Sequence, residues 1–179
     1  MWAILILIVL VLLVFVLYNG LVRLKVQADA AWSDIDVQLK RRYDLIPNLV
    51  ETVKGYASHE KGTLEAVIEA RSRAMSASGP AAKGEAENQL TGALKSLFAL
   101  SEAYPQLRAA ENFGALQASL ATIEDAIQNA RRYYNAVVRD LNTRILTFPS
   151  NLIARTFGFR EREYFEIAEG ERSVPKVSF

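Results

Sequence analysis

The sequence contains no cysteine, a single histidine and only five prolines, and these shortages exclude several kinds of site. Without cysteine there is no disulfide, no thiolate metal site and no lipid attached through a cysteine. One histidine, His59, cannot supply the two Glu-x-x-His pairs of a di-metal helical bundle, and we expect it to be exposed near a helix start. The chain also lacks a Gly-x-Ser-x-Gly elbow and a phosphate-binding glycine loop. We therefore expect no catalytic residue, no metal site and no cofactor, in a protein that is not an enzyme.

Neither sign of charge is in excess: the sequence has 21 basic and 20 acidic residues, and its net charge is +1. The two signs are mixed along the chain rather than gathered in tails. The longest basic run, Lys40 to Arg42, is too short to form a nucleic-acid surface. The composition therefore predicts no nucleic-acid partner.

What the chain does have is an unbroken apolar run from Trp2 to Tyr18. As a helix this run covers roughly 26 Å, and residues up to Val22 extend it to about 30 Å, the thickness of a bilayer core. Trp2 and Tyr18 stand at its ends, where aromatic residues favour the membrane interface. Residues 1–22 are therefore predicted to be a transmembrane anchor, with membrane lipids as partners.

A cleaved signal peptide is the alternative, since Ala28-Asp29-Ala30 resembles a cleavage site. The run is too long for a signal peptide, no basic residue precedes it, and Arg23 and Lys25 follow it directly, so a retained anchor is favoured. These two cations can also contact anionic lipid headgroups. Because the basic residues follow the span, the positive-inside rule predicts a single-pass protein of the inner or plasma membrane, with the N-terminus outside and the rest in the cytoplasm.

Apolar residues then recur at helical spacing in four stretches of residues 23–148, at about 23–57, 59–75, 85–103 and 109–148. Ser58 is expected to cap the second stretch, and residues 76–84 read as a loop. The fold predicted is all-α: a transmembrane helix that continues into an up-and-down four-helix bundle, followed by a short irregular C-terminal tail. In the tail, residues 149–179, we expect at most one short helix near 151–156. Four aromatic side chains are expected to pin the tail to the bundle: Phe157, Phe159, Tyr164 and Phe165.

The predicted core-facing positions follow the period of each helix. In the order of the four helices they are Trp32, Ile35, Leu39, Arg42, Ile46, Leu49, Val53 and Tyr56; Leu64, Val67, Ile68, Arg71 and Met75; Leu90, Leu94, Leu97 and Phe98; and Phe113, Leu116, Leu120, Ile123, Ile127, Ala130, Tyr134, Val137, Leu141 and Phe148.

Charged and polar residues interrupt these apolar lines and predict a polar layer inside the bundle. Arg42 and Arg71 lie on the lines, and Glu124, Arg131 and Asn135 flank the last one. An unpaired buried charge is very costly, so we expect Glu124 to pair with Arg42 or Arg71. The commoner role of such a layer is to set helix register, and a small-ligand or anion site is the alternative.

Pro47-Asn48 lies in the middle of the first bundle helix and predicts a kink there. Proline has no N–H for the carbonyl of Tyr43, four residues earlier. We expect Asn48 to compensate for the lost bond, so that the kink only bends the helix around the core. The alternative is an exposed notch where another protomer docks.

Several longer motifs can now be compared with known families. The runs RRYDLIPNLVETVKGYASHE (41–60), AYPQLRAAENF (103–113), IEDAIQNARRYYNAVV (123–138), LNTRILTFP (141–149) and EYFE (163–166) occur in this order. Together with Ala70-Arg71, they resemble the LemA family. The resemblance implies a four-helix bundle behind an N-terminal membrane segment and brings no catalytic residues. Some relatives begin with a lipoprotein-type segment ending in cysteine, which this chain lacks, so its anchor is expected to be the helix itself.

Taken together, these features predict a membrane-anchored helical scaffold or adaptor that acts through self-assembly and contacts with other membrane proteins. One alternative is a regulatory partner of a membrane protease or stress-response system. Another is a helical bundle that senses a small molecule or lipid through its polar layer.

Overall fold

The computed structural model describes residues 1–166, and within this part of the chain all regular structure is α-helical. The prediction of an all-α fold is thus confirmed. The helices are α1 (Trp2–Tyr56), α2 (Lys61–Ser76), α3 (Pro80–Ser101), α4 (Pro105–Arg108), α5 (Glu111–Leu146) and α6 (Ser150–Thr156).

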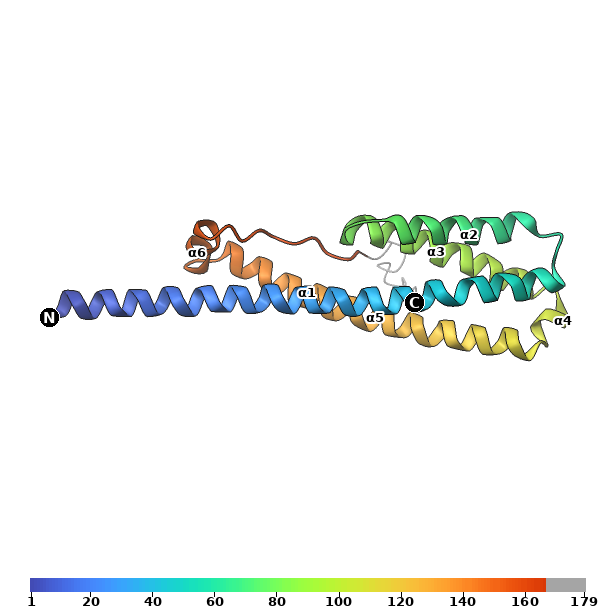
Figure 1. Ribbon diagram of the computed structural model, residues 1–179, viewed down its shortest axis with the longest axis horizontal. Helices are drawn as coiled ribbons and strands as arrows, with labels where there is room; N and C mark the ends of the chain where they lie inside the picture. Colours follow the sequence, from blue (N-terminus) through green and yellow to red (C-terminus); the bar gives the residue numbers. More distant parts are fainter. Residues whose placement is uncertain (167–179) are drawn as a thin grey trace, which may run out of the picture. The chain divides into compact units, whose positions relative to one another are not determined.

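Helix α1 runs unbroken from the apolar segment into the bundle (Figure 1). Its first part is long and apolar enough to cross a membrane, and only 6% of that 18-residue window is buried. Every residue from 1 to 16 is exposed. The first part of α1 therefore presents an apolar surface that the described residues leave uncovered.

The chain divides into two compact units, and α1 and α5 each contribute to both. The first unit consists of Met1–Ile35 and Asn129–Tyr164, and the second of Asp36–Gln128 together with Phe165 and Glu166. The second unit is the helical bundle, built from the later part of α1, α2, α3, the single turn α4 and the first part of α5.

The core of the second unit is made of apolar side chains spaced three and four residues apart, as predicted. Fully buried examples are Leu39, Ile46, Leu49, Val53, Val67, Leu90, Leu97 and Leu107. Truncating one such leucine to alanine typically costs about 2–5 kcal/mol, so these positions carry much of the stability. The tail adds Phe165, fully buried beside Gly84 of α3. A Cβ at Gly84 would lie 3.1 Å from the Glu166 carbonyl oxygen, so glycine lets the backbones approach closely.

Some predicted core positions are wrong. Ile68 and Met75 are about half exposed, and Ala70 and Ala74 are buried in their place. A short amphipathic helix has apolar residues over a wide arc, and only its neighbours decide which edge of the arc is covered. Tyr56 is likewise 47% exposed, since α1 ends there.

Helix ends also differ from the expectation. Glu60, not Ser58, occupies the N-cap position of α2, without a side-chain cap bond. Residues 80–84 are helical rather than loop because Pro80 begins α3, and proline is favoured at a first helical position. Helix α5 ends at Leu146, so Phe148 lies beyond it and is 79% exposed.

In the first unit, the segment after α6 is held by hydrogen bonds to α1 and α5. The Asn142 side chain makes two 2.9 Å bonds with the backbone of Arg162, donating to its carbonyl and accepting from its N–H. The Arg162 guanidinium donates to Asp29 at 2.6 Å. The Tyr134 hydroxyl donates to the Glu163 carbonyl at 3.0 Å. Polar contacts thus hold the tail at Arg162 and Glu163.

The four tail aromatics do not all pin the tail as predicted. Phe165 is fully buried and Phe159 is half-buried, but Phe157 is 54% exposed and Tyr164 is 39% exposed. The rest of the predicted tail, residues 167–179, lies outside the described residues.

Candidate functional site

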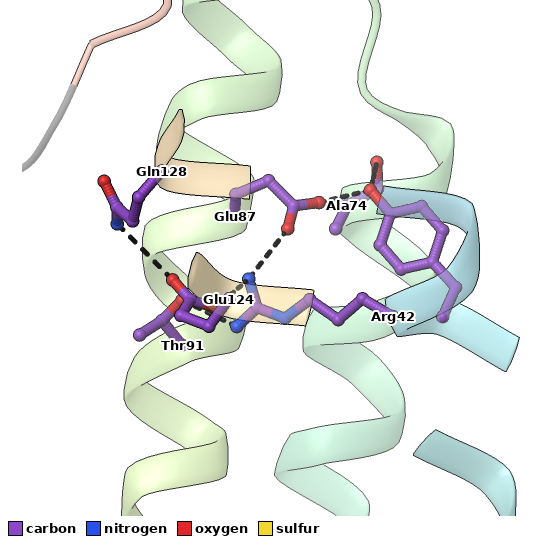
Figure 2. Close-up of polar contacts among 7 residues, drawn as sticks. Arg42, Ala74, Glu87, Thr91, Glu124 and Gln128 are labelled. Carbon is purple, nitrogen blue, oxygen red and sulfur yellow. Dashed lines mark hydrogen bonds and ion pairs between the residues drawn. The ribbon is translucent and has the colours of Figure 1, made fainter. Parts of the chain in front are cut away.

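The candidate site is a buried cluster around Arg42, which α1 places inside the second unit (Figure 2). Arg42 is 3% exposed, and its Nη1 lies 3.2 Å from Glu87 of α3 and 3.3 Å from Glu124 of α5. Its Nη2 donates to the Thr91 hydroxyl at 2.7 Å. One guanidinium therefore links three helices through two carboxylates and a hydroxyl.

Glu87 is the most deeply buried acidic partner, with 4% of the residue exposed. Its other carboxylate oxygen accepts a hydrogen bond from the Tyr43 hydroxyl. Burial raises the pKa of Glu87, although the Tyr43 bond and the Arg42 charge act in the opposite direction. Burial and the bond to Glu87 also raise the pKa of Tyr43. The cluster therefore holds one cation between two carboxylates, and burial disfavours the ionised form of Glu87.

Sequence reasoning missed Glu87, Tyr43 and Thr91. A signal for Glu87 was present, because it lies three residues before Leu90 and continues the line of Leu90, Leu94 and Leu97. Tyr43 is adjacent to a predicted core residue, and nothing in its spacing marks its hydroxyl as a partner.

Arg71 has a different role from Arg42. Its Nε donates to the Tyr43 backbone carbonyl at 2.8 Å. In a continuous helix the N–H of residue 47 would donate to this carbonyl, but Pro47 of α1 has no N–H. Arg71 thus replaces the missing intrahelical donor. The expectation that Asn48 would do so is wrong: both Pro47 and Asn48 are exposed.

The structure brings together only some of the predicted polar layer. Glu124 contacts Arg42, as the pairing hypothesis required, and accepts from Gln128 at 3.5 Å. Arg131 is buried and Asn135 half-buried, but both belong to the first unit.

The predicted membrane-interface residues all belong to the first unit. Trp2 is 82% exposed, and Arg23 and Lys25 are exposed. Tyr18 is half-buried because its ring packs on Phe157 and Phe159.

A cavity of about 370 Å³ lies beside the Arg42 cluster. Its lining combines apolar side chains, among them Leu94, Phe98 and Leu120, with polar and charged ones: Arg42, Thr91, Lys95, Gln117, Glu124 and Gln128. Within residues 1–166 no group of three or more histidine, cysteine or acidic side chains is placed to hold a metal ion. His59 is exposed, as expected. The chemistry available is thus charge pairing and hydrogen bonding beside a cavity of mixed polar and apolar lining.

Replacing Glu124 by alanine tests the ion pair between Glu124 and Arg42, which is the more exposed of the two pairs. We expect a loss of about 1 kcal/mol in the free energy of unfolding, because the Glu124 side chain is 35% exposed and its attraction to Arg42 is screened by solvent. Urea unfolding in mild detergent, followed by far-UV circular dichroism, measures the change. The control is Asp125→Ala, which removes the carboxylate of an exposed neighbour on the same helix. Unchanged stability in Glu124→Ala would contradict the pairing.

Comparison with known proteins places these features in a family. The LemA family model matches residues 31–179, which include the whole second unit. The magnetosome protein MamQ of Magnetospirillum gryphiswaldense is 26% identical over 174 residues, covering 83% of this chain and 64% of MamQ. MamQ 1 of Paramagnetospirillum magneticum is 26% identical over 175 residues, with the same coverage. Protein LemA of Metamycoplasma hominis is 27% identical over 158 residues, covering 86% of this chain and 71% of that protein.

The chain spans about 64% of the length of the MamQ proteins it matches, and none of these names describes an enzyme. The family match begins at residue 31, after the apolar part of α1, and continues through the helices that carry Arg42, Glu87 and Glu124. Since this match covers most of the sequence, the chain belongs to the LemA family.

Proposed function

We propose that this protein is a non-enzymatic, membrane-anchored scaffold that assembles with itself and contacts other membrane proteins. The observation that carries the proposal is the uncovered apolar surface of residues 1–16, continuous through α1 with a bundle. An exposed apolar surface of this length is stable in a lipid bilayer and unfavourable in water. The bundle's buried charges bond to one another, which is what a structural core requires.

The anchor crosses the inner or plasma membrane once, with the N-terminus outside and the bundle in the cytoplasm. The positions of Arg23 and Lys25, exposed and directly after the span, support this orientation.

Self-assembly is supported by apolar side chains that the bundle leaves on its surface. Ile68 and Met75 are about half exposed and lie seven residues apart, so they occupy the same side of α2. Anchoring in one membrane presents this side of every copy at a similar height, which raises the effective concentration for contact. The exposed Pro47 and Asn48 offer a second place for a protomer to dock.

The native mass of the full-length protein in mild detergent tests self-assembly. We expect light scattering to show a defined oligomer for the full chain and for Ser72→Gln, an exposed control on α2. Ile68→Gln/Met75→Gln should dissociate it, and a chain starting at Gln27 should be smaller or monomeric because it lacks the anchor. A monomeric full-length protein would overturn self-assembly. Stoichiometric capture of one other membrane protein would then favour a regulatory partner of a protease or stress system.

A ligand-sensing bundle is the second candidate, and the cavity beside Arg42 and Glu124 is the observation that favours it. Its volume of about 370 Å³ and its mixed lining suit a small molecule with both apolar and polar groups. A saturable rise in melting temperature with a defined small molecule, abolished by Leu120→Trp, would support sensing over scaffolding.

A further inference from the structure

Large apolar side chains are exposed in a short stretch around α6, far along the sequence from the anchor. Leu146 is 61% exposed, Phe148 79%, Leu152 55% and Phe157 54%. Single exposed apolar residues are ordinary on a protein surface, but four within twelve residues indicate a contact surface. The sequence alone suggested that the tail aromatics face the bundle, and the exposure of Phe157 contradicts that for this residue.

This stretch adjoins the anchor within the first unit (Figure 1). The Phe157 ring lies 4.8 Å from the ring of Tyr18, the aromatic residue at the end of the apolar run. Phe157 also lines a groove of about 330 Å³ with Leu10, Val14 and Phe15. Apart from the Tyr18 hydroxyl, the side chains lining the groove carry no polar atom. The apolar surface of α1 thus continues onto Phe157 without a polar break.

Cations flank the same surface. Arg155 and Arg160 are exposed on either side of Phe157, and Arg144 is exposed at the end of α5. The Arg144 guanidinium lies against α1 at Gly20, which follows Tyr18 by two residues. A Cβ atom at Gly20 would be only 3.1 Å from Arg144 Nη1. No carboxylate among residues 1–166 forms an ion pair with any of these three arginines. Asp29 pairs with Arg162 and Asp140 with Arg139, whereas the exposed Glu161, next to Arg160 in the sequence, forms no ion pair within residues 1–166.

We propose that residues 144–160 form a second membrane contact, at the interface where the anchor leaves the bilayer. Phe148, Leu152 and Phe157 enter the boundary between headgroups and acyl chains, and an acyl chain fills the groove between α1 and Phe157. Arg144, Arg155 and Arg160 bind lipid phosphates. This inference rests on the membrane anchor of the proposed function.

The occupant is a lipid rather than a second copy of the chain, for two reasons. The surface is continuous with the span, so whatever covers residues 10–15 also reaches Phe157. Arg144 lies at Gly20, and Arg160 lines a pocket with Tyr18 and Val22, where a helix of this length meets the headgroups. Anionic headgroups attract arginine at this level. Apolar side chains with arginines beside them are typical of interfacial segments.

The absence of cysteine allows a direct test, because one introduced cysteine takes an environment-sensitive fluorophore at a single position. Full-length protein is labelled at Leu152→Cys, at Val14→Cys in the span, or at Ser33→Cys as the aqueous control. Ser33 is exposed on the same helix, about 22 Å beyond Tyr18 at 1.5 Å per residue. Each variant is placed in vesicles of phosphatidylcholine and phosphatidylglycerol, and quenching by nitroxide lipids is compared with quenching by aqueous iodide.

We expect lipid quenching to exceed iodide quenching at positions 14 and 152, and the reverse at position 33. If position 14 is in lipid but position 152 is quenched by iodide, the second contact is wrong and the anchor stands. If position 14 is quenched by iodide as well, the anchor itself is wrong. Protection of position 152 from both quenchers would indicate a protein contact and overturn the lipid assignment.

The charged part of the contact is tested with Arg144→Gln/Arg155→Gln/Arg160→Gln in the Leu152→Cys chain. We expect lipid quenching at position 152 to fall severalfold in vesicles that contain phosphatidylglycerol. The matched control, Arg132→Gln/Arg139→Gln, removes two exposed arginines of α5 and should leave quenching unchanged. Equal quenching in the triple variant and the control would show that the arginines do not bind lipid phosphate.

Discussion

Replacing Arg42 by methionine is expected to lower the free energy of unfolding of the bundle by about 3–5 kcal/mol near neutral pH. Methionine keeps much of the side-chain length but removes the cation that Glu87 and Glu124 share. Glu124 can turn to solvent because its side chain is 35% exposed, whereas Glu87 stays buried. The cost therefore comes chiefly from a buried carboxylate without its cation.

The cost should depend on pH in a defined direction. Burial raises the folded-state pKa of Glu87 above its ordinary value of 4.5, so at a pH between these two values the folded protein binds a proton more readily than the unfolded chain. The stability that Glu87 contributes is complete below pH 4.5 and declines as pH rises through the raised pKa. Removing Arg42 removes an attraction that lowers this pKa, so the pKa rises further and the decline extends to higher pH. Arg42→Met should thus cost least in acid and most near neutral pH.

Urea unfolding of the detergent-solubilised protein between about pH 4 and pH 8 measures this dependence. The control is Arg41→Met, which removes a neighbouring exposed arginine whose side chain makes a long 3.5 Å bond to Gln38. Adding Glu87→Gln to Arg42→Met should restore part of the stability at neutral pH, because the cluster then has no buried charge. Equal losses for Arg42→Met and Arg41→Met would refute the buried network.

The second large effect is expected at Arg71, whose replacement by methionine should cost about 1–3 kcal/mol. The Nε of Arg71 donates to the Tyr43 carbonyl at 2.8 Å, and Pro47 has no N–H to replace it. Arg71→Met therefore leaves a backbone carbonyl inside the bundle without this donor. The loss should be smaller in a Pro47→Ala background, because alanine restores the intrahelical N–H donor.

A double-mutant cycle of these two positions isolates the coupling. The four proteins are the unaltered chain, Arg71→Met, Pro47→Ala and the double variant, each unfolded in urea under the same conditions. Arg73→Met, on the exposed side of α2, controls for the general effect of losing an arginine there. Strictly additive losses at positions 47 and 71 would show that Arg71 does not replace the donor that proline lacks.

The sequence was informative about α1 and α5 because their patterns are long. An apolar run from Trp2 to Tyr18 and lines of core residues at helical spacing are local properties, which hold whatever the helix packs against. For the same reason, the burial of Arg42 followed from its place between Leu39 and Ile46. Short elements were less well determined, as the exposed Ile68 and the unexpected start of α3 at Pro80 show.

By itself, the sequence determined that the chain is helical, that it begins with an apolar span and that it carries a buried arginine in the first bundle helix. Only the tertiary structure decided that Arg42 forms ion pairs with both Glu87 and Glu124. It also decided that Arg71 donates to the Tyr43 carbonyl, which has no donor from Pro47. Likewise, only the structure placed Phe157 against Tyr18 of α1 rather than in the bundle core. Periodicity gives the side of a helix on which a residue lies, but the partner depends on how neighbouring helices rotate and slide, and that is set by the packing of the whole core.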